Sequence, residues 1–176
     1  MKKWILAFKD ITLASLITLG IYILLNFILR LIMNYIPGDF FKLFFLGCAT
    51  ETLFCLCLLY IRHLRQEKGE KNFIVEIREQ PYETMKIDIQ RVFFAERHLL
   101  IIICGIILLS AIINLLPFQR NPLILFSPLF ILETAFSIWK LDIIGNLLSV
   151  LIVPVVYTSL LCRKRAKWHK KWAKAD

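Results

Sequence analysis

Motifs that mark common enzymes and cofactor sites are missing from this chain. It has no Walker phosphate-binding loop, no GxGxxG dinucleotide motif, no GxSxG nucleophile motif and no HExxH zinc motif. Acidic residues are also scarce, with 13 Asp and Glu against 22 Lys and Arg in 176 residues. The sequence therefore predicts no catalytic set, no cofactor and no metal site, and its informative features lie elsewhere.

Long apolar runs take up most of the chain, which is 59% hydrophobic. Each of four runs is long enough, or nearly so, to cross the ~30 Å hydrocarbon layer as a helix that rises about 1.5 Å per residue. We expect spans at residues 11–33, 40–61, 99–116 and 143–162. The fold class is therefore predicted to be all-α: a polytopic integral membrane protein, a four-span helical bundle in one membrane domain over residues 1–176.

The basic residues are unevenly distributed, and this sets the expected orientation. The amino terminus, residues 62–97 and the carboxyl tail together hold 18 of the 22 Lys and Arg, leaving Arg30, Lys42, Arg120 and Lys140 for the other side. Cytoplasmic segments of membrane proteins are enriched in Lys and Arg. We therefore expect a multi-pass protein of the cell membrane with both termini in the cytoplasm.

The loop at residues 62–92 is the only sizeable soluble piece, a small cytoplasmic insertion. It opens with a charged continuation of the preceding helix, and then Phe73, Val75 and Ile77 recur at every second position until Pro81 interrupts the pattern. Beyond the break, Met85, Ile87 and Ile89 alternate in the same way. The segment could therefore be the second strand of a hairpin or a helix that starts at Thr84. We favour a strand followed by a helix.

Residues 128–139 are too few to cross a membrane, although they are apolar. Ser127 suits an N-cap and Pro128 the first helical position. Glu133, Ser137 and Lys140 share one helical face, as expected for an amphipathic helix at a membrane surface. We predict an outer interfacial or re-entrant helix.

Glu51 is the most informative single residue, because it lies midway along the second predicted span. A carboxylate at that depth costs about 2.5–3.5 kcal/mol, so it should be buried, paired or protonated. No Lys or Arg lies at matching depth in any predicted span, so we expect a neutral acid that hydrogen-bonds a hydroxyl such as Tyr22 or Ser149. A proton- or cation-coupled site and a purely structural acid both remain open.

Polar residues also form stripes on two predicted spans. The stripe on the first contains Ser15, Thr18, Tyr22 and Asn26, and that on the fourth contains Asp142, Gly145, Asn146, Ser149 and Tyr157. Small and polar side chains allow membrane helices to approach closely and to hydrogen-bond across the interface. We expect both stripes to face the interior of the bundle.

Two arrangements are conceivable near the outer surface. Arg30 and Asp142 could form a partly desolvated ion pair. Alternatively, Asp39 and Asp142 could face one cleft as a protease-like pair of carboxylates.

At the cytoplasmic end, His63, Glu96 and His98 lack the spacing of zinc ligands and are interpreted as interfacial polar residues. Residues 163–176 form a basic tail that suits the headgroups of anionic lipids. The lipid-facing candidates in this tail are Arg163, Lys164, Arg165, Trp168 and Trp172.

The cysteines all lie within or at the end of predicted spans: Cys48, Cys55, Cys57, Cys104 and Cys162. No Cys-x-x-Cys pair is present, and Cys55 and Cys57 point about 200° apart on a helix, so they cannot clamp one metal ion. We interpret all five as small core residues.

Three function classes follow from these patterns. The first is a non-enzymatic subunit or accessory component of a membrane assembly. Its expected partners are the lipid bilayer and either other membrane chains or further copies of itself, and no nucleic acid is expected. The second is a small transporter or channel protomer that uses Glu51. The third is an intramembrane enzyme acting at Asp39 and Asp142 or at His63 and His98.

Overall fold

The computed structural model describes residues 2–35, 37–67, 85–115, 126, 131–137 and 141–172. Most of these residues are helical, and the exceptions include residues 34–35, 37–38, 96 and 141. The helices are α1 (Lys2–Met33), α2 (Asp39–Glu67), α4 (Met85–Ala95), α5 (Arg97–Leu115), α6 (Ile131–Ser137) and α7 (Asp142–Trp172). The prediction of an all-α helical bundle is confirmed.

Three helices, α1, α2 and α7, are long and apolar enough to cross a membrane, and α4 and α5 together make a fourth candidate that is bent by 72°. In lipid, a helix satisfies its own backbone donors and acceptors, which is why such apolar runs become helices rather than extended segments. Many large apolar side chains are exposed along these helices, as expected of a lipid-facing surface; examples are Ile23, Leu24, Phe41, Ile112 and Leu151.

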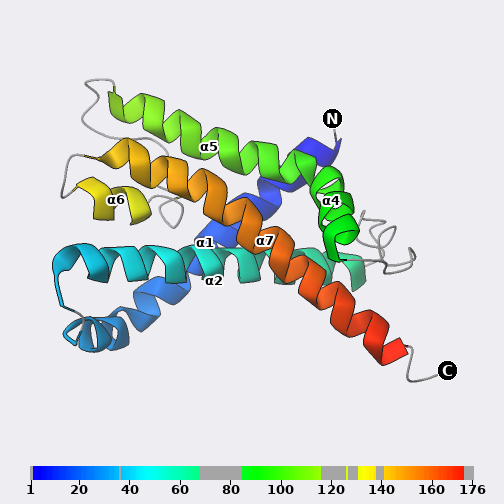
Figure 1. Cartoon of the computed structure of the whole chain (residues 1–176), viewed down its shortest axis with the longest axis horizontal. Helices are drawn as coiled ribbons and strands as arrows, with labels where there is room; N and C mark the ends of the chain where they lie inside the picture. Colours follow the sequence, from blue (N-terminus) through cyan, green and yellow to red (C-terminus); the bar gives the residue numbers. More distant parts are fainter. Residues whose placement is uncertain are drawn as a thin grey trace.

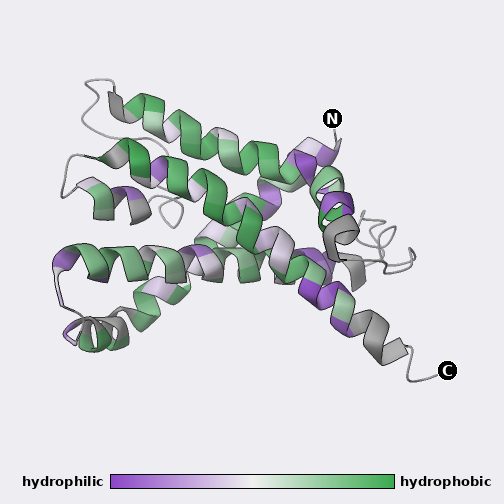
Figure 2. Ribbon diagram, viewed as in Figure 1, coloured by the Kyte–Doolittle hydropathy of each residue, from purple (hydrophilic) through white to green (hydrophobic). Residues whose placement is uncertain are grey.

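In Figure 1, α7 passes across α1 and α2 near the centre of the bundle, and α5 runs along one side of it. The start of α1, the end of α2, α4 and the end of α7 lie at one end, which we call the terminal end. The turn from α1 to α2, α6 and the start of α7 lie at the opposite end. Hydrophilic residues are concentrated at the terminal end, and hydrophobic residues dominate the middle of each long helix (Figure 2).

The turn between α1 and α2 is tight, as predicted. Gly38 has a φ of 77°, in the left-handed region that residues with a Cβ adopt only at a cost. Its carbonyl accepts the Lys42 amide at 3.2 Å, which starts α2. Asp39 occupies the first turn of α2, where a carboxylate favours the positive end of the helix dipole.

The first long helix contains the predicted span. α1 covers Lys2–Met33, so residues 11–33 lie within it and the helix continues toward the amino terminus. Lys9 and Asp10 are therefore helical residues of α1. Asp10 is only 2% exposed, and basic residues of α2 pair with its carboxylate.

Residues 85–95 are helical, which confirms the helix of the favoured interpretation and excludes a hairpin strand there. The predicted strand at residues 73–77 lies outside the described residues. The helix does not run straight into the third span, because the chain bends sharply at Glu96. The charged continuation of α2 is helical through Glu67, as expected.

The short α6 packs against both α2 and α7, and Phe136 lies edge-on against Phe40 with ring centroids 5.2 Å apart. Seven residues cannot cross a bilayer, in agreement with the prediction.

Phe126, which precedes α6, is 6% exposed and contacts Phe8 near the start of α1, with ring centroids 6.2 Å apart. The Phe126 side chain therefore lies within the bundle. The residues on either side of it lie outside the described part of the chain, so the outer interfacial or re-entrant helix stays a prediction. The predicted cap at Ser127 and Pro128 lies outside the described residues.

Candidate functional site

Four charged side chains meet at the terminal end, and we call them the charged cluster: Asp10, Arg62, Arg65 and Glu96. Arg62 donates a hydrogen bond to Glu96 with an Nη2 to Oε1 distance of 2.9 Å. Its other terminal nitrogen lies 3.8 Å from Asp10, whose second oxygen is 2.9 Å from Nε of Arg65. Two guanidinium groups thus balance two carboxylates.

The cluster joins elements that are far apart in the sequence. Asp10 comes from α1, both arginines come from the end of α2, and Glu96 lies in the bend between α4 and α5. Asp10 and Glu96 are each only 2% exposed. Removing one partner of a buried ion pair leaves an uncompensated charge and costs about 3–5 kcal/mol, so the cluster fixes these elements relative to one another.

Tyr157 of α7 extends this polar region. Its side chain is fully buried in the region of Glu96, Arg62 and Asp10. Within the described part of the chain, the Tyr157 hydroxyl and the Oε2 atom of Glu96 make no hydrogen bond. The fourth long helix therefore also packs near the charged cluster, although it makes no direct hydrogen bond to the cluster in the described structure.

The sequence did not predict this cluster. Glu96 was interpreted as an interfacial residue, Arg62 counted only as a cytoplasmic basic residue, and Asp10 had no assigned role, because each lies at the edge of an apolar run. The available signal was the presence of opposite charges near the same predicted membrane face: an acid before the first span, basic residues after the second and an acid before the third.

Glu51 forms a second polar contact nearer the centre of the bundle. It is fully buried on α2, and its Oε1 accepts a hydrogen bond of 2.5 Å from the Ser149 hydroxyl on α7. This confirms Ser149 as a partner. Tyr22 is half-buried and makes no hydrogen bond to Glu51 among the described residues, and the Asn26 side chain lies outside them.

The polar stripes follow the expected orientation where the structure describes them. Ser15 and Thr18 of α1 and Asn146, Ser149 and Tyr157 of α7 are all buried. Thr18 donates to the backbone carbonyl of Ala14 at 2.7 Å, a bond within its own helix. Of these residues, only Ser149 donates a side-chain hydrogen bond to another helix in the described structure.

Two cysteines contact the backbone of α7 near Pro154. A proline in a helix cannot donate to the carbonyl four residues earlier, which here is Val150. The Cys104 thiol lies 4.0 Å from that carbonyl oxygen, and the Cys55 thiol donates to the Val153 carbonyl at 3.7 Å. None of the five cysteines forms a disulfide bond. Cys55 and Cys104 thus pack around the proline in α7, and their thiols lie against two backbone carbonyl oxygens of that helix.

The outer candidates are only partly described. The Asp39 side chain is exposed and lies 3.5 Å from Nζ of Lys42 in the next turn. The side chains of Arg30 and Asp142 lie outside the described residues. The Arg30 to Asp142 ion pair and the Asp39 to Asp142 carboxylate pair therefore both remain predictions.

His63 and His98 at the terminal end are half-buried. His98 packs edge-on against Trp4, with ring centroids 4.6 Å apart. Among the described residues, no group of three or more His, Cys, Asp and Glu side chains is arranged to hold a metal ion. His98 therefore serves here as a packing partner of α1.

The basic tail begins as a continuation of α7, which is helical as far as Trp172. Arg163 and Lys164 are exposed, as expected for residues facing lipid headgroups. Arg165 differs from the prediction because it is buried. Residues two apart on a helix point about 200° away from each other, so Arg165 faces the bundle when Arg163 faces outward. The side chains of Trp168 and Trp172 lie outside the described residues.

Comparison with known protein families, curated proteins and solved structures finds no match to this chain. The proposal for its function therefore rests on the sequence and on the geometry of the bundle.

Proposed function

We propose that this chain is a non-enzymatic polytopic membrane protein that serves as a subunit or accessory component of a membrane assembly. The observation that carries the proposal is the internal pairing of the charged cluster. Arg62 binds Glu96 and Asp10, and Asp10 binds Arg65, so these charges hold helices together. In a site that binds a substrate, by contrast, polar groups converge on a space that the substrate can occupy.

The proposed topology places the protein in the cell membrane with both termini and the terminal end of the bundle in the cytoplasm. The excess of Lys and Arg in the segments at that end supports this orientation. The proposed partners are other membrane chains or further copies of this chain, which would contact the exposed apolar faces within the bilayer.

Native mass spectrometry of the full chain, extracted with its surrounding lipid, tests the proposal. We expect a complex of fixed stoichiometry, containing either copies of this chain or a co-purifying membrane protein. An unrelated membrane protein of similar size, expressed with the same tag, controls for non-specific association. Recovery of the chain as a monomer bound only to lipid contradicts the proposal.

A second candidate function is proton- or cation-coupled transport through Glu51. It is favoured by one observation: Oε2 of Glu51 makes no hydrogen bond to the described residues, although the side chain is fully buried. A Glu51→Gln variant keeps the shape and can still accept the Ser149 hydrogen bond, but it cannot titrate. In proteoliposomes, transport that depends on pH in the parent and not in this variant would support the second function. Absence of transport by the parent removes it.

A further inference from the structure

The bend between α4 and α5 forms an elbow at the terminal end, which we define as residues 93–98. The two helices meet at 72°. The backbone stays hydrogen-bonded through the bend, because the Glu96 amide donates to Val92 at 2.9 Å and the Glu96 carbonyl accepts the Leu100 amide at 3.0 Å. The Glu96 side chain is bound by Arg62 of α2. The elbow is therefore anchored at its vertex, and the direction of α4 is set.

The anchored α4 has one face in the protein and one face outside it. Val92 is buried in the core, and Ile89 and Ala95 pack against that core. Phe93 and Phe94 are 48% and 69% exposed, and their rings lie edge-on with centroids 6.4 Å apart. Two adjacent phenylalanines are thus held outward at the vertex of the elbow. Exposure of this much aromatic surface to water is costly.

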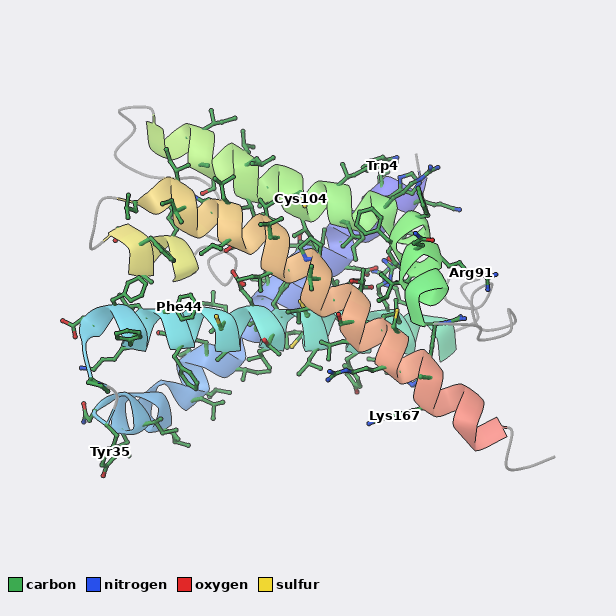
Figure 3. All side chains as sticks on the ribbon, in the orientation of Figure 1. Trp4, Tyr35, Phe44, Arg91, Cys104 and Lys167 are labelled. Atoms are coloured by element: carbon green, nitrogen blue, oxygen red, sulfur yellow. The ribbon has the colours of Figure 1, made fainter. Side chains whose placement is uncertain are left out.

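Exposed basic residues lie at the same end of the bundle as this aromatic pair. Arg97 is exposed within the elbow itself. The labelled side chains of Trp4, Arg91 and Lys167 lie at the same end of the bundle (Figure 3). Further exposed cations of α1 and α7 are Lys3, Lys9, Arg163 and Lys164. The acids Asp10 and Glu96 are buried and paired, so they contribute little negative charge to this surface.

We propose that the elbow binds anionic phospholipids of the leaflet at the terminal end. Phe93 and Phe94 insert at the boundary between headgroups and acyl chains, and Arg97 contacts the lipid phosphate. Exposed apolar residues beside cations are the pattern of a helix that lies in a membrane surface, and anionic headgroups attract such cations. This site is separate from the basic tail and does not depend on the proposed role as an assembly subunit.

Quenching of tryptophan fluorescence by brominated lipids tests the proposal in the full chain. A Phe94→Trp variant is reconstituted into phosphatidylcholine vesicles that contain an equal minor fraction of either brominated phosphatidylglycerol or brominated phosphatidylcholine. The emission of the parent is subtracted, because the chain contains other tryptophans. We expect the anionic brominated lipid to quench the added tryptophan at least about twofold more strongly than the neutral one.

Leu24→Trp is the matched control, because Leu24 is 80% exposed and lies 20 residues beyond Trp4 on α1, about 30 Å along the helix. We expect the two lipids to quench it equally.

Adding Arg97→Gln to Phe94→Trp should remove the preference for the anionic lipid, and Phe93→Trp provides a second reporter if Phe94→Trp fails to fold. Equal quenching by both lipids at the elbow overturns the proposed headgroup selectivity. No quenching by either lipid shows that the elbow faces water or another protein and overturns the proposal entirely.

Discussion

Arg62 and Glu96 are 34 residues apart in the sequence, yet their side chains share a buried hydrogen bond of 2.9 Å. The bond joins the end of α2 to the vertex of the α4–α5 elbow, and the contacts of Asp10 with Arg62 and Arg65 add α1 to the same unit. Three chain segments are therefore held by one group of charges at the terminal end. Because a low-dielectric environment strengthens both the attraction and the penalty for a missing partner, this group is sensitive to single substitutions.

The hydrogen bond between Glu51 and Ser149 should contribute measurably to stability. We expect Ser149→Ala to lower the free energy of unfolding by about 0.6–2 kcal/mol, the range for hydrogen bonds between membrane helices. Unfolding by SDS in mixed micelles measures this loss. Ser15→Ala is the matched control, because Ser15 is equally buried and its hydroxyl makes no hydrogen bond in the described structure. Equal losses for the two variants would show that the contact with Glu51 adds nothing.

The burial of Phe126 predicts a large cost of truncation. Phe126→Ala removes a ring that packs against Phe8, and replacing a buried phenylalanine by alanine costs about 3–5 kcal/mol. Phe94→Ala, at an exposed ring, should cost far less. The same SDS titration compares the two variants. If Phe126→Ala is as well tolerated as Phe94→Ala, Phe126 does not anchor this part of the chain in the bundle.

The proposed orientation is testable with two introduced cysteines at opposite ends of the bundle. Tyr35 and Lys167 are both exposed and lie at opposite ends (Figure 3). A membrane-impermeant thiol reagent should label Tyr35→Cys in intact cells and Lys167→Cys only in inside-out vesicles. The parent protein, labelled in the same way, measures the background from its five native cysteines. The reverse pattern would invert the topology, and labelling of both from one side would rule out an even number of spans.

The spans were predictable from sequence because a bilayer sets both the length and the composition of a membrane helix. The apolar runs at residues 11–33, 40–61, 99–116 and 143–162 correspond to α1, α2, α5 and α7, although α1 starts before its run and α2 and α7 continue beyond theirs. The contact between Glu51 and Ser149 was also predictable, since a buried acid without a basic neighbour has few partners other than hydroxyl groups.

The charged cluster and the depth of Phe126 were not predicted, and the reasons are physical. Hydropathy ends a span at the first charges, but Asp10 lies inside the bundle because arginines from another helix compensate its charge. Which charges pair depends on helix crossings that a single sequence does not specify. Phe126 is an apolar residue in a short segment, and neither its composition nor its spacing distinguishes a surface position from one against Phe8.

The central claim is that the charged cluster stabilises the fold. A double-mutant cycle on Arg62 and Glu96 tests this claim most directly, with Arg62→Met, Glu96→Leu and the double variant unfolded by SDS. We predict that each single variant loses about 3–5 kcal/mol, because a buried charge is left without its partner. The double variant should lose at least about 2 kcal/mol less than the sum of the two. Additive losses, or single variants as stable as the parent, would contradict the account.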